Sequence, residues 1–140
     1  MTRISASIKP VELCDKMLMA EHREIIRIPN TIKTGKAKVN LNKISNNFKL
    51  GTGHVTFFYN KLEYLHKRYN LLYLECKKRG FNVQNYNNCF EGLPENLYNN
   101  WSEDINTRKI VIERINTRLE TMKTIKYYSK NIELNKIKLK

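Results

Sequence analysis

One carboxylate, Glu24, lies among arginines in the segment AEHREIIRIP at residues 20–29. Arg23 precedes it directly, and Arg27 follows within one helical turn. A surface helix could use this arrangement as a local ion pair, which stabilises a helix by only about 0.2–0.5 kcal/mol. Alternatively, the position of Glu24 at the border between the apolar stripe and the solvent-facing side of the predicted helix suits a chemical role. Glu24 is therefore a candidate catalytic acid, and the surface ion pair remains the alternative.

Basic residues that could contact phosphate groups gather in two parts of the chain. No acidic residue occurs between Arg27 and Lys61, and the lysines of this span are Lys33, Lys36, Lys38, Lys43 and Lys49. An ordinary solvated loop mixes charges of both signs, so this loop is predicted to face phosphate. Farther along the chain, Arg114 and Arg118 are four residues apart and could bind neighbouring phosphates.

Two adjacent tyrosines, Tyr127 and Tyr128, lie in a lysine-rich tail that begins at about residue 123. Exposed tyrosines among lysines are suited to stacking on nucleic-acid bases. Tyrosines that pack against a hydrophobic core are at least as common. The sequence leaves both interpretations of these two side chains open.

The sequence has no motif of closely spaced side chains that would bind a metal or a cofactor. The cysteines form no CxxC pair, and the histidines lie far from any tight cysteine cluster; these residues are Cys14, Cys76, Cys89, His22, His54 and His66. The 13 acidic residues are scattered, whereas metal-dependent nucleases need several carboxylates that converge on cations. Glycine-rich phosphate loops and the GxSxG nucleophile motif are also absent. No metal and no cofactor are expected, and the cysteines are predicted to be reduced thiols.

The overall charge favours a polyanionic partner. The chain has 26 basic and 13 acidic residues, a formal net charge of +13 over 140 residues, which favours nucleic acid first and an anionic membrane surface second. No apolar run approaches the roughly 20 residues of a membrane-spanning helix. Residues 1–20 mix charged with apolar positions, unlike a signal peptide. We therefore expect a protein that is intracellular and not secreted, with no membrane association.

Three helices are predicted to position these residues within one domain of 140 residues. The first begins at Pro10, after a polar lead of residues 1–9, and ends at Pro29. The second spans residues 54–80, with Gly80 as its stop signal. Its core stripe is predicted to be Val55, Phe58, Leu62, Leu65, Tyr69, Leu72 and Cys76.

The third predicted helix begins at Ser102, which is followed by two acidic residues. Its apolar face is predicted to be Ile105, Ile112, Ile115, Leu119 and Met122. No segment has a strand period long enough to predict a sheet. The fold class predicted from these patterns is all-α, a compact single domain of three main helices joined by long basic loops.

Several segments of the sequence resemble one known enzyme family. MTRI at the start, LMAEHRE followed by Arg27, KLGTGHVTFFYNKLEYLHKR and ECKKRGFN are similar to the pyrimidine-dimer DNA glycosylases, the UV endonucleases of T-even phages and chlorella viruses. The resemblance runs from residue 2 to about residue 83 and continues more weakly through RINTRL and KYYSK. It implies a helical, single-domain DNA repair enzyme that acts without metal on double-stranded DNA containing pyrimidine dimers or abasic sites. We expect this enzyme to be a monomer.

The family resemblance also implies roles for individual residues. Such enzymes use the free α-amino group of the second residue as the nucleophile, which here is Thr2 after removal of Met1. The required acid matches Glu24, and the arginines that contact DNA match Arg3, Arg23 and Arg27; the basic positions of the third helix match Arg114 and Arg118. The imine formed by the amine releases the 5′ base of the dimer, and β-elimination then nicks the strand.

The sequence departs from this family in several places. One residue is inserted before the first helix, Met17 stands where phage relatives carry histidine, and the tail lacks the family's tryptophan. In addition, the basic loop is somewhat shorter, and a lysine-rich extension follows Lys130. Two other functions therefore stay open. The chain could be a non-catalytic basic DNA-binding protein, or an abasic-site lyase with a different damaged-base specificity.

Overall fold

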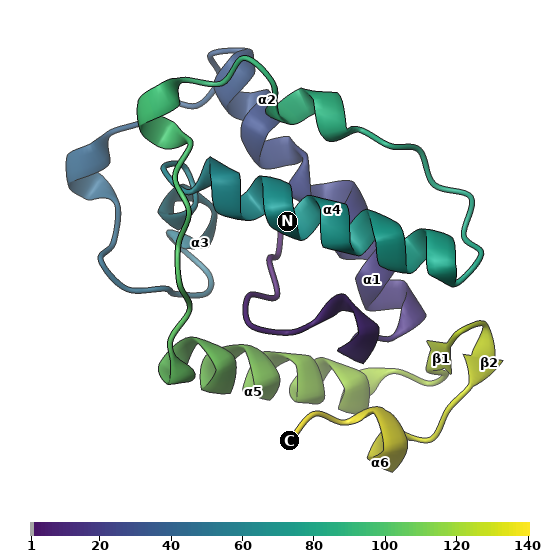
Figure 1. The fold of residues 1–140 in the computed structure, drawn as a ribbon. Coiled ribbons are helices and arrows are strands. Elements are labelled where there is room, and N and C mark those ends of the chain that lie inside the picture. The colour runs from purple at the N-terminus through teal and green to yellow at the C-terminus, as the bar shows by residue number, and fades with distance from the viewer. Residues whose placement is uncertain (1) are drawn as a thin grey trace.

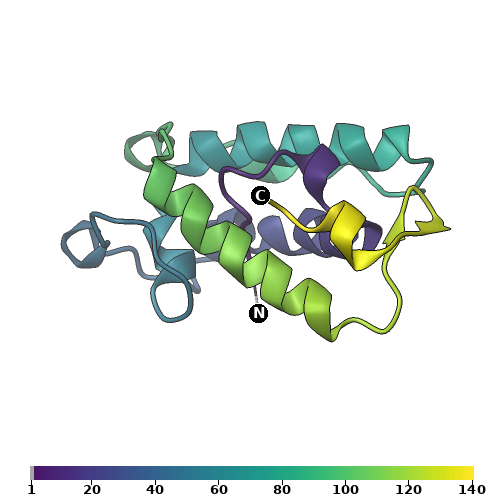
Figure 2. The same ribbon diagram turned by 90° about the horizontal axis from the view of Figure 1, so that it is seen from below.

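The computed structural model describes residues 2–140. Two helices, α1 (Asp15–Ile25) and α4 (Leu62–Lys78), pack against each other, and α5 (Ile105–Thr121) lies across from them. The leading segment runs between α5 and this pair of helices in both views of the ribbon (Figures 1 and 2). Its core residues Ile4, Ala6 and Ile8 are almost fully buried. The predicted all-α fold class is confirmed, and the polar lead predicted at residues 1–9 is an interior segment over its described part.

Both boundaries predicted for the first helix, residues 10 and 29, were wrong. Residues Pro10–Glu12 form a 3-10 helix, and α1 begins only at Asp15. Pro29 does not end the helical region, because α1 ends just before Ile26 and a second helix, α2 (Arg27–Lys33), follows. Pro29 therefore occupies the first turn of α2, where a backbone N–H has no partner within the helix and its absence costs little.

The second predicted helix is also two helices, α3 (His54–Phe57) and α4. The predicted core stripe is confirmed from Phe58 to Cys76, since all six of these side chains have an exposed fraction of 0%. Val55 is half-buried against the same core. Gly80 ends the helix as predicted, with a positive φ of 83° that a residue without a side chain adopts at no steric cost.

The third predicted helix begins later than expected. Asp104 caps α5, because its carboxylate accepts a hydrogen bond from the Thr107 N–H at 2.8 Å. The prediction that Ile105 belongs to the core was wrong, since 71% of this residue is exposed. Ile115 and Leu119 are buried as predicted, and Val111, which was not predicted, extends the buried face at the same four-residue spacing.

The remaining elements are short. Three 3-10 helices span Leu41–Lys43, Asn87–Phe90 and Glu95–Leu97. The tail is ordered as a hairpin of β1 (Lys126–Tyr127) and β2 (Lys130–Asn131), followed by α6 (Leu134–Ile137). The sequence predicted no strand here, because two-residue strands carry too few positions to show a period. Within residues 2–140, no helix has the length and apolar character that crossing a membrane requires.

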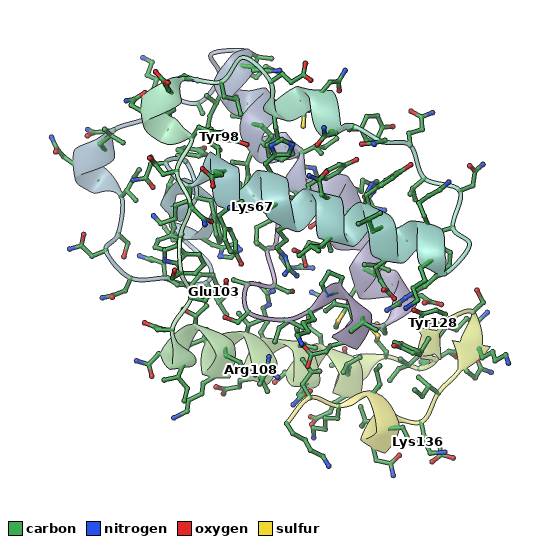
Figure 3. All side chains as sticks on the ribbon, in the orientation of Figure 1. Lys67, Tyr98, Glu103, Arg108, Tyr128 and Lys136 are labelled. Atoms are coloured by element: carbon green, nitrogen blue, oxygen red, sulfur yellow. The ribbon has the colours of Figure 1, made fainter. Side chains whose placement is uncertain are left out.

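Two buried arginines on and after α4 fasten the chain together. Arg68 forms an ion pair with Glu21 and donates to the Ile8 carbonyl at 2.8 Å. At the other end of α4, Arg79 binds Asp15 and Glu75 at 2.9 and 2.8 Å. Figure 3 shows Tyr128 at the point where the hairpin meets this end of α4. The leading segment and the tail are thus both tied to the α1–α4 pair.

Candidate active site

The leading segment reaches the carboxylate of Glu24. The backbone N–H of Arg3 donates a hydrogen bond to Glu24 Oε1 at 3.3 Å. The nitrogen of Thr2 is three covalent bonds from that of Arg3, so it lies within about 8 Å of the same oxygen. Thr2 and Glu24 are each only 9% exposed. The fold therefore brings the second residue of the chain beside the acid on the first helix, while Met1 lies outside the described residues.

A small hollow opens where the leading segment, α1 and α5 meet. Its volume is about 70 Å³, enough for a few water molecules but not for a nucleoside. The residues that line it are Arg3, Ser5, Lys16, Met17, Ala20, Glu21, Glu24, Arg114, Ile115, Arg118 and Met122. Glu24 therefore lines a hollow that is too small to enclose a nucleoside.

Positive charge dominates the walls of the hollow. Glu21 is paired with the buried Arg68, so Glu24 is the acid in the hollow that Arg68 does not neutralise. Among residues 2–140, no acidic side chain lies within 4.0 Å of the guanidinium groups of Arg3, Arg114 or Arg118. Burial lowers the pKa of Arg114. The negative charge of Glu21 opposes this shift, and the positive charges of Arg3 and Arg118 add to it. These unpaired cations make the site suited to an anionic ligand.

A family model described as pyrimidine dimer DNA glycosylase matches residues 1–87. The chain belongs to this family. The matched span includes the leading segment, all of α1 and α4, and both Thr2 and Glu24. It stops before α5, so Arg114 and Arg118 of the glycosylase are placed at the site by the fold alone. A DNA repair glycosylase acting on pyrimidine dimers has DNA as its substrate.

A histidine that the sequence analysis did not select holds the next residue of the lead. The N–H of Ile4 donates to His54 Nε2 at 2.9 Å, and His54 Nδ1 lies 2.9 Å from the Lys49 carbonyl oxygen. Because Nε2 accepts, Nδ1 must carry the proton and donate. Burial lowers the pKa of His54, in keeping with a neutral ring. The available signal was a histidine next to Gly53 within an otherwise apolar run.

The two arginines flanking Glu24 do not clasp it closely. Arg23 Nη2 lies 4.0 Å from Glu24 Oε2, and 66% of the Arg23 side chain is exposed. Arg27 is exposed and forms no ion pair within the described part of the glycosylase. Glu24 is buried, and no ion pair joins it to Arg27 among the described residues, so the alternative interpretation of Glu24 as half of a surface pair with Arg27 was wrong. Both arginines remain available to DNA, and that role stays a prediction.

Three other predicted DNA contacts lie outside the hollow. Lys33 donates to the Asn88 carbonyl at 3.2 Å. The other two are Tyr127 and Tyr128, whose rings cover Arg79. The guanidinium carbon of Arg79 lies 4.6 Å from the Tyr127 ring centroid and 4.7 Å from that of Tyr128. Their hydroxyl groups donate to the Val11 carbonyl and the Glu75 carboxylate, each at 2.7 Å. The structure thus favours packing for the tyrosines, and contact of these side chains with DNA stays untested.

The described residues contain no group of three or more His, Cys, Asp or Glu side chains that could hold a metal ion. Met17 lines the hollow but has no titratable group to offer there. The three cysteines are free and buried, and burial raises the pKa of the Cys76 and Cys89 thiols to about 11. The chemical groups at the site are therefore the Glu24 carboxylate, the Glu21 carboxylate that pairs with Arg68, a set of cations, the Ser5 hydroxyl and the backbone of the lead.

Proposed function

We propose that this glycosylase excises the 5′ base of UV-induced pyrimidine dimers through an imine with the α-amino group of Thr2, and then nicks the strand by β-elimination. The observation that carries this proposal is the hydrogen bond from the Arg3 N–H to Glu24. It brings the residue that would bear the amine next to a carboxylate that lines a cationic hollow. The amine becomes available when Met1 is removed.

An α-amine is a suitable nucleophile for this reaction. Its ordinary pKa is about 7.7–8.0, compared with about 10.4 for a lysine side chain. At pH 7.4 roughly a quarter of the amine is therefore neutral, against about a thousandth of a free lysine. The amine attacks C1′ as the glycosyl bond breaks, and loss of a proton with opening of the sugar ring gives the imine.

Glu24 is proposed to act in both steps. During base release its negative charge stabilises the cationic character that develops at C1′. After imine formation its carboxylate removes a proton from C2′, and the C3′–O bond breaks to cut the strand. The carboxylate oxygen that accepts the weak 3.3 Å hydrogen bond is not saturated by strong donors, so it can accept that proton.

The basic residues are proposed to hold the duplex around this centre. Arg3, Arg114 and Arg118 line the hollow without acidic partners among the described residues, so they can bind phosphates next to the lesion. Arg23 and Arg27 would extend the contact along α1 and α2. A DNA repair activity implies that the enzyme acts inside the cell, where DNA is accessible. We propose that it acts as a monomer without metal.

Borohydride trapping tests this proposal directly. We expect a covalent protein–DNA adduct on duplex DNA that contains a pyrimidine dimer, in buffer with a chelator. Acetylation of the amino terminus should abolish the adduct, since the acetylated nitrogen cannot form an imine. The matched control is Thr2→Ser, which changes the side chain but keeps the amine and should leave the adduct yield within about twofold. An adduct that survives acetylation would overturn the assignment of the nucleophile.

Two other outcomes would identify the alternative functions. Tight, salt-sensitive binding with no adduct on dimer or abasic DNA would indicate a DNA-binding protein without catalysis. An adduct on abasic DNA but none on dimer DNA would indicate a lyase whose glycosylase step recognises another damaged base. Nicking of UV-irradiated plasmid separates both from the proposed function.

A further inference from the structure

The first described residues of the chain are held by consecutive backbone hydrogen bonds. Arg3 N–H donates to Glu24 and Ile4 N–H donates to His54. The second bond is the shorter, at 2.9 Å against 3.3 Å, and it is buried. The Ile4 side chain is fully buried in the core. His54 is thus the side chain that fixes the backbone two residues after the proposed nucleophile.

The loop before His54 is built to orient its ring. Gly51 and Gly53 have positive φ values of 67° and 91°, which an L side chain rarely adopts. This bend lets the His54 N–H donate to the Gly51 carbonyl at 3.0 Å, while the Lys49 carbonyl accepts from the ring. A Cβ on Gly53 would come within 3.0 Å of the Lys49 side chain. The loop therefore sets which ring nitrogen carries the proton.

Aromatic packing holds the ring from the sides. Phe48 and Phe58 meet His54 edge to face, with ring centroids 5.4 and 5.5 Å away. Only 4% of His54 is exposed. With both nitrogens bonded and both flanks packed, the ring has one orientation available.

We propose that His54 is a positioning residue, which holds the leading segment so that the amine of Thr2 stays within reach of Glu24 and the sugar. This inference rests on the proposed function. It also gives the basic loop a part in the reaction, because His54 joins the Lys49 carbonyl to the Ile4 N–H. His54 contacts no substrate atom in this proposal and acts only through the backbone it holds.

The bond to Ile4 requires a neutral imidazole, because a protonated ring would direct an N–H at the N–H of Ile4. The groups around the His54 ring have opposite effects on whether it is protonated. Arg114 of α5 disfavours the protonated ring and Glu21 of α1 favours it, while the Lys49 carbonyl also favours it. Burial outweighs these and lowers the pKa of His54. The ring is therefore kept in the form that the lead requires.

Replacing His54 should misplace the amine without removing any group that binds DNA. A displacement of about 1 Å at a reacting centre can cost about 100-fold in rate. We therefore expect His54→Phe to slow single-turnover imine formation on abasic DNA by about 10- to 100-fold. The Kd for an uncleavable abasic analogue should change by less than about threefold. His54→Gln keeps a side-chain acceptor for Ile4 and should recover most of the rate.

His66 supplies the matched control. Its ring nitrogens also have two partners, Tyr98 and Asn87 at 2.7 and 2.6 Å, and the ring stacks on Phe90 at 4.8 Å. Its hydrogen bonds and ring contacts all reach the segment that follows α4, at Asn87, Phe90 and Tyr98. His66→Phe should lower the thermal midpoint as His54→Phe does, yet leave the imine rate unchanged. Equal rate losses in both variants would reduce His54 to a structural residue and overturn the proposal.

Amide exchange provides a readout that needs no activity. In the wild type the Ile4 N–H should exchange slowly, and in His54→Phe its protection should fall by about tenfold or more relative to core amides of α4. If His54→Phe does not fold, the same comparison is made with His54→Gln, which should keep the protection. Unchanged exchange at Ile4 in a folded His54→Phe variant would refute the proposal. Absence of an imine in the wild type would instead refute the proposed function.

Discussion

Helix α1 carries a buried acid near each end, and the two differ in how completely they are bound. Asp15 accepts from Arg79 at 2.9 Å and from the N–H groups of Tyr128 and Ser129 at 3.0 and 2.7 Å. Glu24 accepts one 3.3 Å hydrogen bond and has a distant, exposed arginine 4.0 Å away. Both residues are less than a tenth exposed.

The difference separates an acid used for stability from one available for chemistry. A carboxylate with strong donors on both oxygens has no unused bonding capacity and fixes the groups around it. Asp15 holds a two-residue turn in which Tyr128 and Ser129 both have positive φ values, 51° and 67°, a conformation that costs free energy for such residues. Glu24 instead faces cations that lack acidic partners, so an incoming substrate can complete its surroundings.

The largest expected effect comes from Glu24→Gln. Removing the charge should slow cleavage of the 5′ glycosyl bond in dimer-containing duplex by about 10²- to 10⁴-fold, because both proposed steps use the carboxylate. The thermal midpoint should stay close to the wild type, since the amide can still accept from Arg3. Single-turnover glycosylase assays and calorimetry measure the two quantities. A fully active Glu24→Gln enzyme would remove the distinction between the two acids.

Asp15→Ala should have the opposite pattern, with a large loss of stability and little loss of activity. Breaking a buried ion pair by removing one partner costs about 3–5 kcal/mol of unfolding free energy, and here two turn N–H groups also lose their acceptor. Urea unfolding measures the loss. At a temperature where the variant stays folded, its imine rate on abasic DNA should remain within about threefold of the wild type. A loss of activity as large as that of Glu24→Gln, in folded protein, would contradict the assignment of Asp15 to stability.

Sequence patterns identified Glu24 but not what surrounds it. A carboxylate among arginines is a local feature, and the family resemblance supplied Thr2. The bonds from Ile4 to His54 and from Arg114 to Ser5 join residues 50 and 109 positions apart. No local period reports such pairs, so the positioning of the lead required the structure.

The helices were predicted best where packing repeats along the chain. The stripe of α4 is buried at successive helical turns, and its period was visible in the sequence. The errors in the predicted helix boundaries occurred where one helix ends and another begins, and at helix caps. Pro29 was taken as a stop although it fits the first turn of α2, and the Asp104 cap moved the start of α5. The hairpin depends on Asp15, a residue more than a hundred positions away.

A smaller effect is expected from the cations that face Glu24. Arg118 lines the hollow, whereas Arg108 on the same helix already pairs with Glu12 at 3.3 Å. Arg118→Gln should lower the slope of log affinity against log salt by about 0.9 on duplex DNA, the change for one phosphate contact. Arg108→Gln should leave the slope unchanged. Fluorescence anisotropy over a salt series measures both, and equal slopes for the two variants would show that the hollow does not face phosphate.

The smallest effect concerns His22, which lies on α1 between the two acids and must stay neutral. Its ring stacks on Tyr69 at 5.1 Å, and its Nε2 is buried without a partner among residues 2–140. Burial lowers the pKa of His22 below its ordinary value of 6.5, so the unfolded chain binds this proton more readily. The unfolding free energy should therefore fall as the pH drops from 6.5 towards the depressed pKa, by at most about 1.4 kcal/mol per pH unit for this group.

His22→Phe should remove that part of the acid sensitivity. Phenylalanine keeps the stacking on Tyr69 and eliminates a buried nitrogen that has no hydrogen bond within the described structure. Urea unfolding at a series of pH values from 7.5 to about 5 should then give a flatter curve than the wild type, with the remaining slope due to groups such as His54. An unchanged slope would mean that His22 binds its proton equally well in the folded and unfolded states. His22 would then not be the neutral residue between Asp15 and Glu24 on α1.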